Sequence, residues 1–369
     1  MAADLPDHAA VPDDPTADGD FLLGKGEYNM KEEHNPIEEY NAIQQQLSQV
    51  PPGAVLFQCQ DDSLPSPSCR QLDVPIQGKG RIQFQSLLPG AELSYHCYAA
   101  QQVSFHHPVQ EDVLQIHYCI QGRVGWNMGE GVEVYLGPGE VCIHSMENPA
   151  DYRLTFPQGY CQAASLTIHL RQLEQQGLNS FQKLELDYQG VYQKLCRKGM
   201  PLGLYPRSDL EILFSTLCNL PEEEAYRKAL CKTRMLWAML ILDCSKFPPR
   251  RSLPRYAAHQ TQLIQQIRDD LVQRLDQPFS ISQLAKTYRI PSLTLKATFK
   301  GVYGMPIAAY LRQSRMQRAQ QLLEQSDADL AEIARQVGWQ SPEKFAKAFR
   351  KHTGVLPAQY RQQRRAKAL

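Results

Sequence analysis

The chain has 369 residues, a formal net charge of zero at pH 7 and ten cysteines. This length exceeds the size at which a single hydrophobic core usually stops growing, so we expect two domains. The charge is unevenly spread, because residues 255–369 hold 19 Lys and Arg against 8 Asp and Glu, giving +11, and the remainder carries −11. A basic C-terminal third beside an acidic remainder is the charge pattern of a nucleic-acid-binding segment joined to one that avoids nucleic acid.

All ten cysteines lie between Cys59 and Cys244 without C-x-x-C spacing, and no secretory signal precedes them. We therefore expect buried, reduced thiols and a cytoplasmic location, with a redox or metal sensor as the alternative. The sequence has no uninterrupted run of 18 apolar residues. No membrane span is expected.

Residues 1–45 are rich in Asp, Glu, Pro and Gly and show little apolar periodicity. Such a segment buries too little apolar surface to offset the entropy lost on ordering, which predicts a disordered acidic tail. An arm that folds onto another domain when a ligand binds is the alternative.

Between residues 55 and 170, short apolar alternations are separated by turn signals such as Pro89-Gly90 and Gly137-Pro138-Gly139. Many short strands at regular spacing indicate a sandwich or a small barrel. The predicted strands are Arg81–Leu87, Glu92–Tyr98, Val113–Ile120, Val132–Leu136, Glu140–His144, Asp151–Phe156 and Cys161–Leu170.

Histidines and aromatic residues are frequent in this strand-rich segment. A metal-dependent barrel enzyme would need two or three His and a carboxylate that converge, usually with an H-x-H pair, which the sequence lacks. We therefore expect surface or pocket histidines, no metal site and no other cofactor; the six are His96, His106, His107, His117, His144 and His169. The aromatic set is expected mainly to fill the core, and in part to line a pocket for an apolar or aromatic ligand; it comprises Tyr95, Tyr98, Phe105, Tyr118, Trp126, Tyr135, Tyr152, Phe156 and Tyr160.

From Gln172 to Phe247 the apolar spacing becomes helical, with predicted helices at Ser208–Leu217 and Glu222–Lys246. The second helix carries a wide apolar stripe that must be buried against another helix, in this chain or in a second copy. The stripe is Leu230, Leu236, Trp237, Leu240, Ile241 and Cys244. Residues 247–254 contain three Pro and two Arg, which do not continue a helix, so residues 248–256 are predicted to form a linker.

After the linker, Ala257–Leu275 is predicted to form an amphipathic helix. Two similar segments follow, Ile281–Leu311 and Leu330–Arg361. They match at Leu284 and Ile333, Ala285 and Ala334, Leu295 and Phe345, Phe299 and Phe349, Gly304 and Gly354, and Tyr310 and Tyr360. This internal repeat predicts two copies of one helical unit.

The second copy shows how each unit is built. Gly338 ends its first helix, because Gly enters the left-handed conformation at little cost. Ser341 is then an N-cap with Pro342 at the first helical position, and the helix that follows buries Phe345 and Phe349. Two short helices joined by a Gly-containing turn, the second one basic, form the helix-turn-helix that enters a DNA major groove.

Pro306–Leu323 lies between the two copies and has apolar residues at helical spacing. It predicts one connecting helix of roughly 27 Å, at about 1.5 Å per residue. Such a rod would hold the two reading heads about one DNA turn apart, roughly 34 Å, so that both enter successive major grooves on one face.

The stretch from about Gln262 to Arg361 resembles the C-terminal DNA-binding domain of the AraC/XylS family of transcription regulators. The resemblance rests on "LKATFK", "YLRQSRMQRAQQLL", "IARQVGW" and "FAKAFRKHTGVLPAQYR", which occur in the family's order. The first copy departs from the family pattern, because Arg289 stands where a turn Gly is usual and Pro291 where a capping Ser is usual. Arg289 would have to take or avoid a left-handed conformation at some cost, and Ser292 would cap one residue late.

DNA-reading positions are expected near the start of the second helix of each head. Lys reaches guanine acceptors, Glu accepts from cytosine, and Leu or Ala touches a thymine methyl group. Base contacts are predicted for Leu293, Thr294, Lys296 and Ala297 in the first head, and for Pro342, Glu343, Ala346 and Lys347 in the second, beside the capping Ser341. Phosphate contacts are predicted for Lys300, Lys344, Arg350 and Lys351.

The resemblance implies an α+β protein: a cupin-like β-barrel with following helices, joined by a linker to an all-α domain with two helix-turn-helix motifs. The predicted ranges are a tail at 1–45, a sensing domain at 46–247, a linker at 248–256 and an AraC-type DNA-binding domain at 257–369. "LGPGEVCI" and "RLTF" resemble cupin barrels.

The implied function is a transcriptional regulator, without catalytic activity, that binds double-stranded DNA and a small-molecule effector and contacts RNA polymerase. A homodimer through the helices after the barrel is possible within the family, and no membrane partner is expected. The effector would be a siderophore, a sugar or an aromatic acid. The alternatives are a metal-dependent cupin enzyme fused to a DNA-tethering module and a DNA-repair alkyl acceptor, the latter disfavoured because no paired cysteines lie near the reader.

Overall fold

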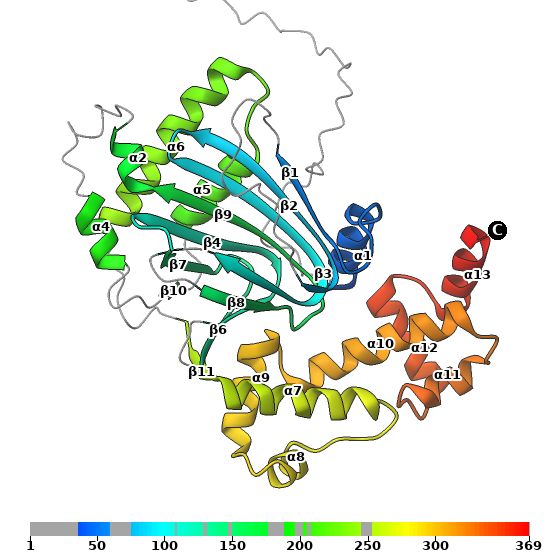
Figure 1. Cartoon of the computed structure of the whole chain (residues 1–369). Coiled ribbons are helices and arrows are strands. Elements are labelled where there is room, and N and C mark those ends of the chain that lie inside the picture. The colour runs from blue at the N-terminus through cyan, green and yellow to red at the C-terminus, as the bar shows by residue number, and fades with distance from the viewer. Residues whose placement is uncertain are drawn as a thin grey trace, which may run out of the picture. The chain divides into compact units, whose positions relative to one another are not determined.

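The computed structural model describes residues 36–59, 75–107, 109–127, 131–146, 150–175, 188–195, 202–204, 208–244 and 253–368. These ranges belong to one compact unit, residues 35–369. Its first half is a curled sheet with helices, and its second half is entirely helical (Figure 1). The predicted α+β class, with an all-α C-terminal part, is therefore confirmed.

The strands of the first half form one curled sheet in the order β10-β7-β4-β9-β3-β8-β5-β6-β11, with β1 and β2 added beside β3. The 17-residue strand β3 explains the curl, because its first half pairs with β9 and its second half with β8. The bounds are β1 Val55–Cys59, β2 Ile76–Leu88, β3 Ala91–His107, β4 Val113–Gly122, β5 Val124–Asn127, β6 Val132–Leu136, β7 Val141–Ser145, β8 Ala150–Thr155, β9 Cys161–His169, β10 Leu202–Leu204 and β11 Arg255–Ala257. All seven predicted strands are present, as an open half-barrel.

Helices cover the outer face of the curled sheet. They are α2 Leu170–Gln175, α4 Tyr188–Leu195, α5 Ser208–Cys218 and α6 Glu224–Cys244, so both predicted helices are confirmed. Leu166 and Ile168 of β9 are fully buried in one apolar cluster with Leu213 of α5 and Met239 of α6. The predicted stripe packs into the same cluster through Leu236, Trp237, Leu240 and Ile241. The stripe therefore packs within this chain, with Ile241 buried and Leu236, Trp237 and Leu240 half-buried, while its packing against a second copy stays a prediction.

The predicted tail is wrong at its C-terminal end, because Pro36–Gln46 forms helix α1. Ile43 and Leu47 are fully buried against Tyr160 and strand β3. The carboxylate of Glu39 accepts a hydrogen bond of 2.8 Å from Tyr160 Oη. Ile43 and Leu47 lie four residues apart and pack this short helix against the sheet. The acidic composition of the surrounding segment made this helix hard to predict. Residues 1–35 lie outside the described residues.

The predicted linker 248–256 also needs correction. Its last residues begin strand β11, which pairs antiparallel with β6 of the curled sheet. Leu253 is buried in the inner apolar cluster of that sheet. The connection is therefore attached to the sheet from residue 253 onward. Pro254 is compatible with this arrangement, because proline is tolerated at the edge of a sheet. Residues 245–252 lie outside the described residues.

The second half contains seven helices among the described residues: α7 Ala258–Gln273, α8 Ile281–Thr287, α9 Ser292–Tyr303, α10 Ile307–Gln325, α11 Leu330–Gln336, α12 Pro342–Thr353 and α13 Pro357–Ala368. They enclose two separate apolar cores. The first joins α7 to α9 and the start of α10, with Leu295 and Phe299 fully buried. The second joins the end of α10 to α13, with Phe345 and Phe349 fully buried.

Tyr135 of β6 belongs to the first of these cores and is almost fully buried there. The curled sheet and the first helical core therefore share apolar contacts.

The described part of the chain contains no helix long and apolar enough to cross a bilayer. Six cysteines whose side chains are described are free thiols, and burial raises the pKa of Cys97 to about 11 and that of Cys142 to about 12.

Candidate nucleic-acid interface

Helices α11 and α12 form the second helix-turn-helix as the sequence predicts. Gly338 adopts φ +78° at the turn, where an added Cβ would lie 2.5 Å from the carbonyl oxygen of Leu275. Only glycine fits both the backbone angle and this close approach. Ser341 then caps α12 by accepting a hydrogen bond of 3.3 Å from the amide of Lys344, with Pro342 beside it. The local rules for helix ends therefore fix this head.

The predicted contact residues of the second head lie on its outer surface. Pro342, Glu343, Lys344, Lys347, Arg350 and Lys351 are exposed, whereas Ser341 and Ala346 are half-buried. Phe345 and Phe349 on the opposite side of α12 are fully buried. This helix thus presents an acid, three lysines and an arginine to solvent while its aromatic side holds it in the core. Whether each residue contacts DNA stays a prediction.

Helices α8 and α9 form the first helix-turn-helix, with a different turn. Arg289 takes the left-handed conformation at φ 52°, which is costly for a residue with a Cβ. The N-cap position of α9 is Pro291, which makes no side-chain cap hydrogen bond. The expected late cap at Ser292 is wrong, because Ser292 is already the first helical residue and its backbone is past the capping geometry.

Most of the predicted contact residues of the first head are also exposed. Leu293, Lys296, Ala297 and Lys300 face solvent, and Thr294 is half-buried. Leu293 is 81% exposed, an unusual environment for a large apolar side chain that is explained if it meets a thymine methyl group. Leu295 and Phe299 are buried on the other side of α9.

Helix α10 connects the two heads without interruption. Its 19 residues correspond to about 28 Å at 1.5 Å per residue, close to the length predicted from the sequence. Arg315 in its middle donates hydrogen bonds of 2.8 Å to the Leu275 carbonyl and 2.9 Å to the Gln277 carbonyl. Its guanidinium also lies over the Trp339 ring. Arg315 thereby ties the loop after α7 to the second head, a role that its sequence position alone does not indicate.

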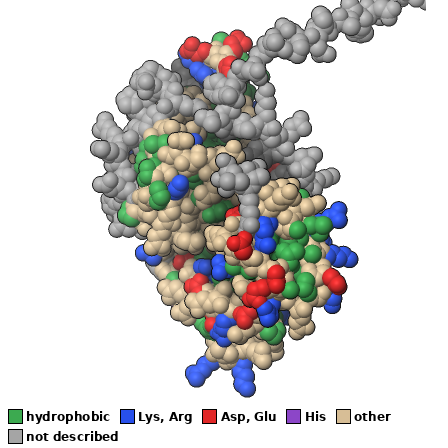
Figure 2. Space-filling view, turned by 90° about the vertical axis from the view of Figure 1, so that its right-hand side faces the viewer, with side chains coloured by type: hydrophobic (Ala, Val, Ile, Leu, Met, Phe, Trp, Pro, Cys, Tyr) green, Lys and Arg blue, Asp and Glu red, His purple; other side chains and the backbone are tan. Residues whose placement is uncertain are grey.

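Charged side chains are mixed on the surface seen in Figure 2. Lys and Arg are spread over the lower part of this view, with Asp and Glu among them. On this face charges of both signs are interspersed, and no single block of positive charge is seen.

The inner face of the curled sheet carries a buried polar cluster, which we define as His117, His144 and Ser165. His117 Nδ1 lies 2.6 Å from Ser165 Oγ, and His117 Nε2 lies 2.8 Å from His144 Nε2. His144 Nδ1 donates to the Ser145 carbonyl at 3.0 Å, because a carbonyl only accepts. In the neutral pair His117 Nε2 therefore donates to His144, and Ser165 donates to His117. Trp126 packs against both rings.

Other hydrogen-bonding groups extend this polar inner face. Gln115 Nε2 donates to Thr167 Oγ1 at 3.1 Å, while the buried Gln115 Oε1 has no hydrogen-bond partner. Tyr98 and Phe156 of the aromatic set are buried and stack on each other, so these two fill the core, the role expected for most of the set. The side chains of His106, His107 and Tyr152 lie outside the described residues. Within the described ranges, no three His, Cys, Asp or Glu side chains gather closely enough to hold a metal ion.

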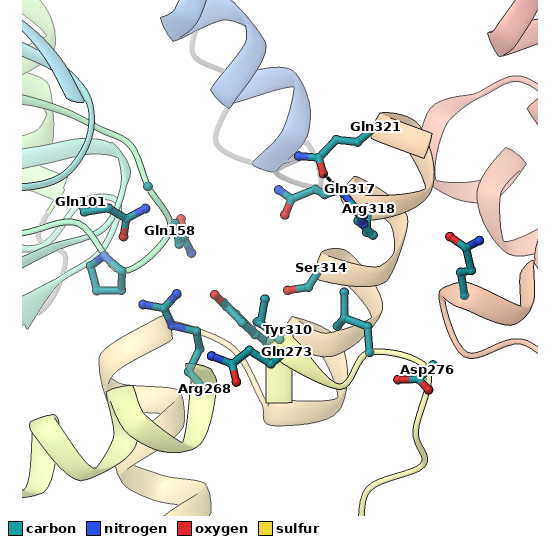
Figure 3. Close-up of a pocket in the computed structure, with 15 residues that line it drawn as sticks. Gln101, Gln158, Arg268, Gln273, Asp276, Tyr310, Ser314, Gln317, Arg318 and Gln321 are labelled. Carbon is teal, nitrogen blue, oxygen red and sulfur yellow. Dashed lines mark hydrogen bonds between the residues drawn. The ribbon is translucent and has the colours of Figure 1, made fainter. Parts of the chain in front are cut away.

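A polar cleft of about 380 Å³ lies between the loop at Pro157–Gly159 and helices α7 and α10 (Figure 3). Gln158 reaches it from the curled sheet, Arg268 from α7, and Tyr310 and Gln317 from α10. The cleft separates the sheet from the helical half beside their apolar contact. Its lining is mostly amide, guanidinium and other polar groups, so this part of the boundary is polar.

Comparisons with known proteins place the likeness in the helical half. Residues 284–363 match a family model described as a helix-turn-helix domain. The HTH-type transcriptional activator RhaR of Cronobacter sakazakii is 38% identical over 89 residues, which are 24% of this chain and 31% of that protein. RhaR of Salmonella schwarzengrund is 33% identical over 91 residues, which are 25% and 32% of the two chains. The chain thus spans about a third of the length of these relatives.

Among solved structures, the C-terminal domain of the two-component response regulator yesN from Fusobacterium nucleatum is 33% identical and has a TM-score of 0.26. The match covers 28% of this chain and 98% of that domain. The matched family residues begin in α8, include both helix-turn-helix units and end in α13. Residues 284–363 therefore carry the helix-turn-helix domain that this family model describes, and the rest of the chain lies outside the match.

Proposed function

We propose that the chain is a sequence-specific transcription regulator that binds double-stranded DNA through its two helix-turn-helix heads. The observation that carries this proposal is the repeated arrangement of α9 and α12. Each helix buries a corresponding pair of apolar side chains, Leu295 and Phe299 or Phe345 and Phe349, and exposes lysine toward solvent. A helix held in this way has the geometry needed to enter a major groove.

The inner face of the curled sheet is the proposed effector site. The His117–His144–Ser165 cluster and the unpaired Gln115 Oε1 favour a small polar ligand that exchanges hydrogen bonds, such as a sugar or a hydroxy acid, over a purely apolar one. Ligand binding would shift the population of arrangements in which the two heads are presented. RNA polymerase and a second copy of the chain are further proposed partners, and the cytoplasm is the proposed location.

The test is selection of duplexes from a random-sequence pool by the full chain, followed by a gel-shift titration of the recovered site. Lys347→Ala is expected to weaken binding about tenfold or more, because a lysine contact to a base edge contributes roughly 1–3 kcal/mol of discrimination. Lys232→Ala on α6 is the matched control, since Lys232 is also exposed but lies outside the helical half. Circular dichroism verifies that both variants are folded.

Recovery of no common site by the wild-type chain, or equal binding by the Lys347→Ala and control proteins, would contradict the proposal. Loss of binding in both variants would show that the charge alone matters.

A further inference from the structure

We propose that Arg123 and Gln158 of the curled sheet form a clasp on the last turn of α9 and position the first reading head. DNA reading by this head then depends on the sheet, whereas the second head reads without that support. The contact itself is a property of the structure. Its consequence for DNA rests on the proposed function.

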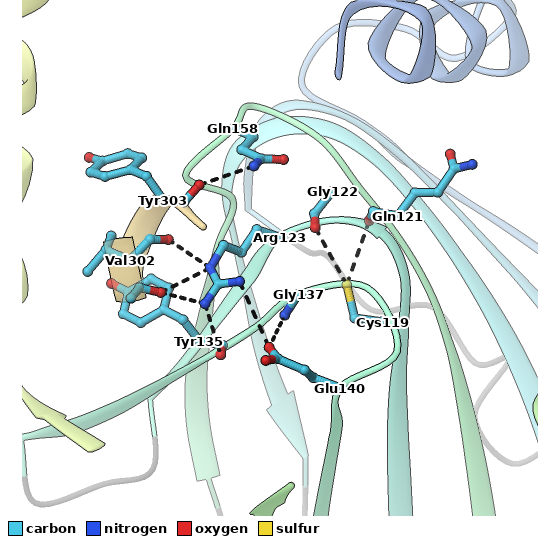
Figure 4. Close-up of polar contacts among 11 residues, drawn as sticks. Cys119, Gln121, Gly122, Arg123, Tyr135, Gly137, Glu140, Gln158, Val302 and Tyr303 are labelled. Atoms are coloured by element: carbon cyan, nitrogen blue, oxygen red, sulfur yellow. Dashed lines mark hydrogen bonds and ion pairs between the residues drawn. The ribbon is translucent and has the colours of Figure 1, made fainter. Parts of the chain in front are cut away.

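The clasp acts on the carbonyl groups that a helix leaves unpaired at its C-terminus. In α9 the Lys300 carbonyl accepts from the amide of Gly304, which takes φ +78°. The Gly301 and Val302 carbonyls accept from Arg123 Nε at 3.0 and 3.1 Å, and Arg123 Nη2 also donates to Gly301. Gln158 Nε2 donates to the Tyr303 carbonyl at 3.2 Å (Figure 4). Side chains from the sheet thus complete the final turn of α9.

Arg123 is itself held in place on the sheet. Its Nη1 lies 3.9 Å from Glu140 Oε2, and both side chains are largely buried, at 12% and 14% exposed. The same carboxylate accepts from the amide of Gly137. Arg123 Nη2 further reaches the Tyr135 carbonyl at 3.5 Å. The guanidinium is therefore fixed by strand β6 and by the turn that joins β6 to β7, and a change in this turn would move the clasp.

The absence of a side chain at residue 301 allows the close approach. A Cβ added to Gly301 would overlap the hydroxyl group of Tyr256, which belongs to β11. The sheet therefore meets α9 at two points, through Arg123 and through the edge strand. The positive guanidinium also lies at the negative end of the helix dipole, where a cation is stabilising.

The two reading helices differ in what stabilises them. Helix α12 is capped at its N-terminus by its own Ser341. At its C-terminus the amide of Gly354 donates to the Arg350 carbonyl, and Thr353 Oγ1 donates to the Phe349 carbonyl. Helix α9 has Pro291 at its N-cap position, without a side-chain cap and after the strained Arg289. This missing N-terminal support is offset at the other end of the helix by Arg123 and Gln158, whose contacts span 178 and 145 positions in sequence. A change in the sheet can therefore alter the position of the first head, because only this head is held by Arg123 and Gln158.

The polar cleft of Figure 3 adds to this argument. Gln158 lines the cleft while it holds Tyr303, and Arg268 lines it while its Nε lies 3.3 Å from Tyr303 Oη. Val302 and Tyr303 of this turn are buried in the apolar core that includes Tyr135 of the sheet. Opening the clasp therefore costs this apolar burial as well as the hydrogen bonds of Arg123 and Gln158.

The experiment compares Arg123→Ala with Arg153→Ala in the full chain, because Arg153 is an exposed arginine on β8 of the same sheet. Footprints are recorded on the duplex selected by the wild-type chain, and Lys347→Ala assigns the half-site of the second head. Arg123→Ala is expected to raise the concentration for half-protection of the first half-site about fivefold or more, with less than about a twofold change at the second. Gln158→Ala should give a smaller change of the same kind.

Hydrogen exchange of the peptide that spans residues 299–305 is the second readout and needs no DNA. It is expected to become faster in Arg123→Ala and to stay unchanged in Arg153→Ala. Unchanged exchange, equal shifts at both half-sites, or tighter protection of the first half-site would each overturn the positioning role. If Arg123→Ala does not fold, the paired replacement Arg123→Gln with Glu140→Gln removes both buried charges together and is measured instead. If hydrogen exchange of residues 299–305 is faster in Arg123→Ala but the wild-type chain selects no duplex, the contact of Arg123 with α9 is supported and the proposed function is rejected.

Discussion

His96 shows how burial sets the chemistry of a single residue on the inner face of the curled sheet. Its Nε2 lies 2.9 Å from Ser94 Oγ and its Nδ1 lies 3.2 Å from Tyr98 Oη. Burial lowers the pKa of His96 to about 4. An unfolded histidine titrates near pH 6.5, so between about pH 6.5 and 4 the unfolded chain binds a proton that the folded chain does not. The stability contributed by the neutral form is therefore lost as the pH falls through this window.

Changing the pH from 7 to 5 is expected to reduce the free energy of unfolding by about 1–2 kcal/mol more in the wild type than in His96→Gln. Glutamine keeps a polar side chain that does not titrate. Urea unfolding of both proteins at the two pH values measures the difference. The same pH dependence in both would mean that His96 is solvated in the folded state.

At the scale of one helix, the two reading helices differ in the serine near their N-termini: Ser341 caps α12, whereas Ser292 does not cap α9. Ser341→Ala is expected to cost about 1 kcal/mol of stability, because the amide of Lys344 loses its acceptor. Ser292→Ala is expected to change stability by less than about 0.5 kcal/mol, since Ser292 makes no cap and is exposed. Urea unfolding of the two variants in parallel gives the comparison. Equal losses would show that Ser292 caps α9 in solution.

The same contrast shows which elements the sequence can predict. Helices α10 and α12 follow from local signals, since apolar spacing, a capping serine and Gly338 act within a few residues. Strands β10 and β11 have three residues each, too few to show a periodicity, and they exist because β7 and β6 offer open edges. The candidate DNA-contacting positions follow from helix geometry. The roles of Arg123 and Arg315 do not, because each depends on carbonyl groups that only the folded chain brings near.

At the scale of the whole molecule, the separation of charge between the two halves should appear as a salt dependence. If the helical half neutralises DNA phosphates, the logarithm of the binding constant falls linearly with the logarithm of salt concentration, by about 0.9 per contacted phosphate. Lys351→Ala is expected to reduce this slope by about 1 for every duplex sequence, because a phosphate contact is blind to sequence. Anisotropy titrations at four salt concentrations measure it. A slope unaffected by the change would place Lys351 away from the backbone of the duplex.

The pairing of β11 with β6 has a practical consequence for protein engineering. A designer who grafts the DNA-binding helices onto another sensor would naturally cut the chain at the proline-rich segment and keep everything after it. Residues Arg255–Ala257, however, complete the donor's own sheet, and Tyr256 and Gly301 fit together across the seam. A working graft must therefore carry its docking edge with it, or supply a host strand and a host arginine in matching positions. The natural unit of exchange in this chain is the reader together with the surface that receives it.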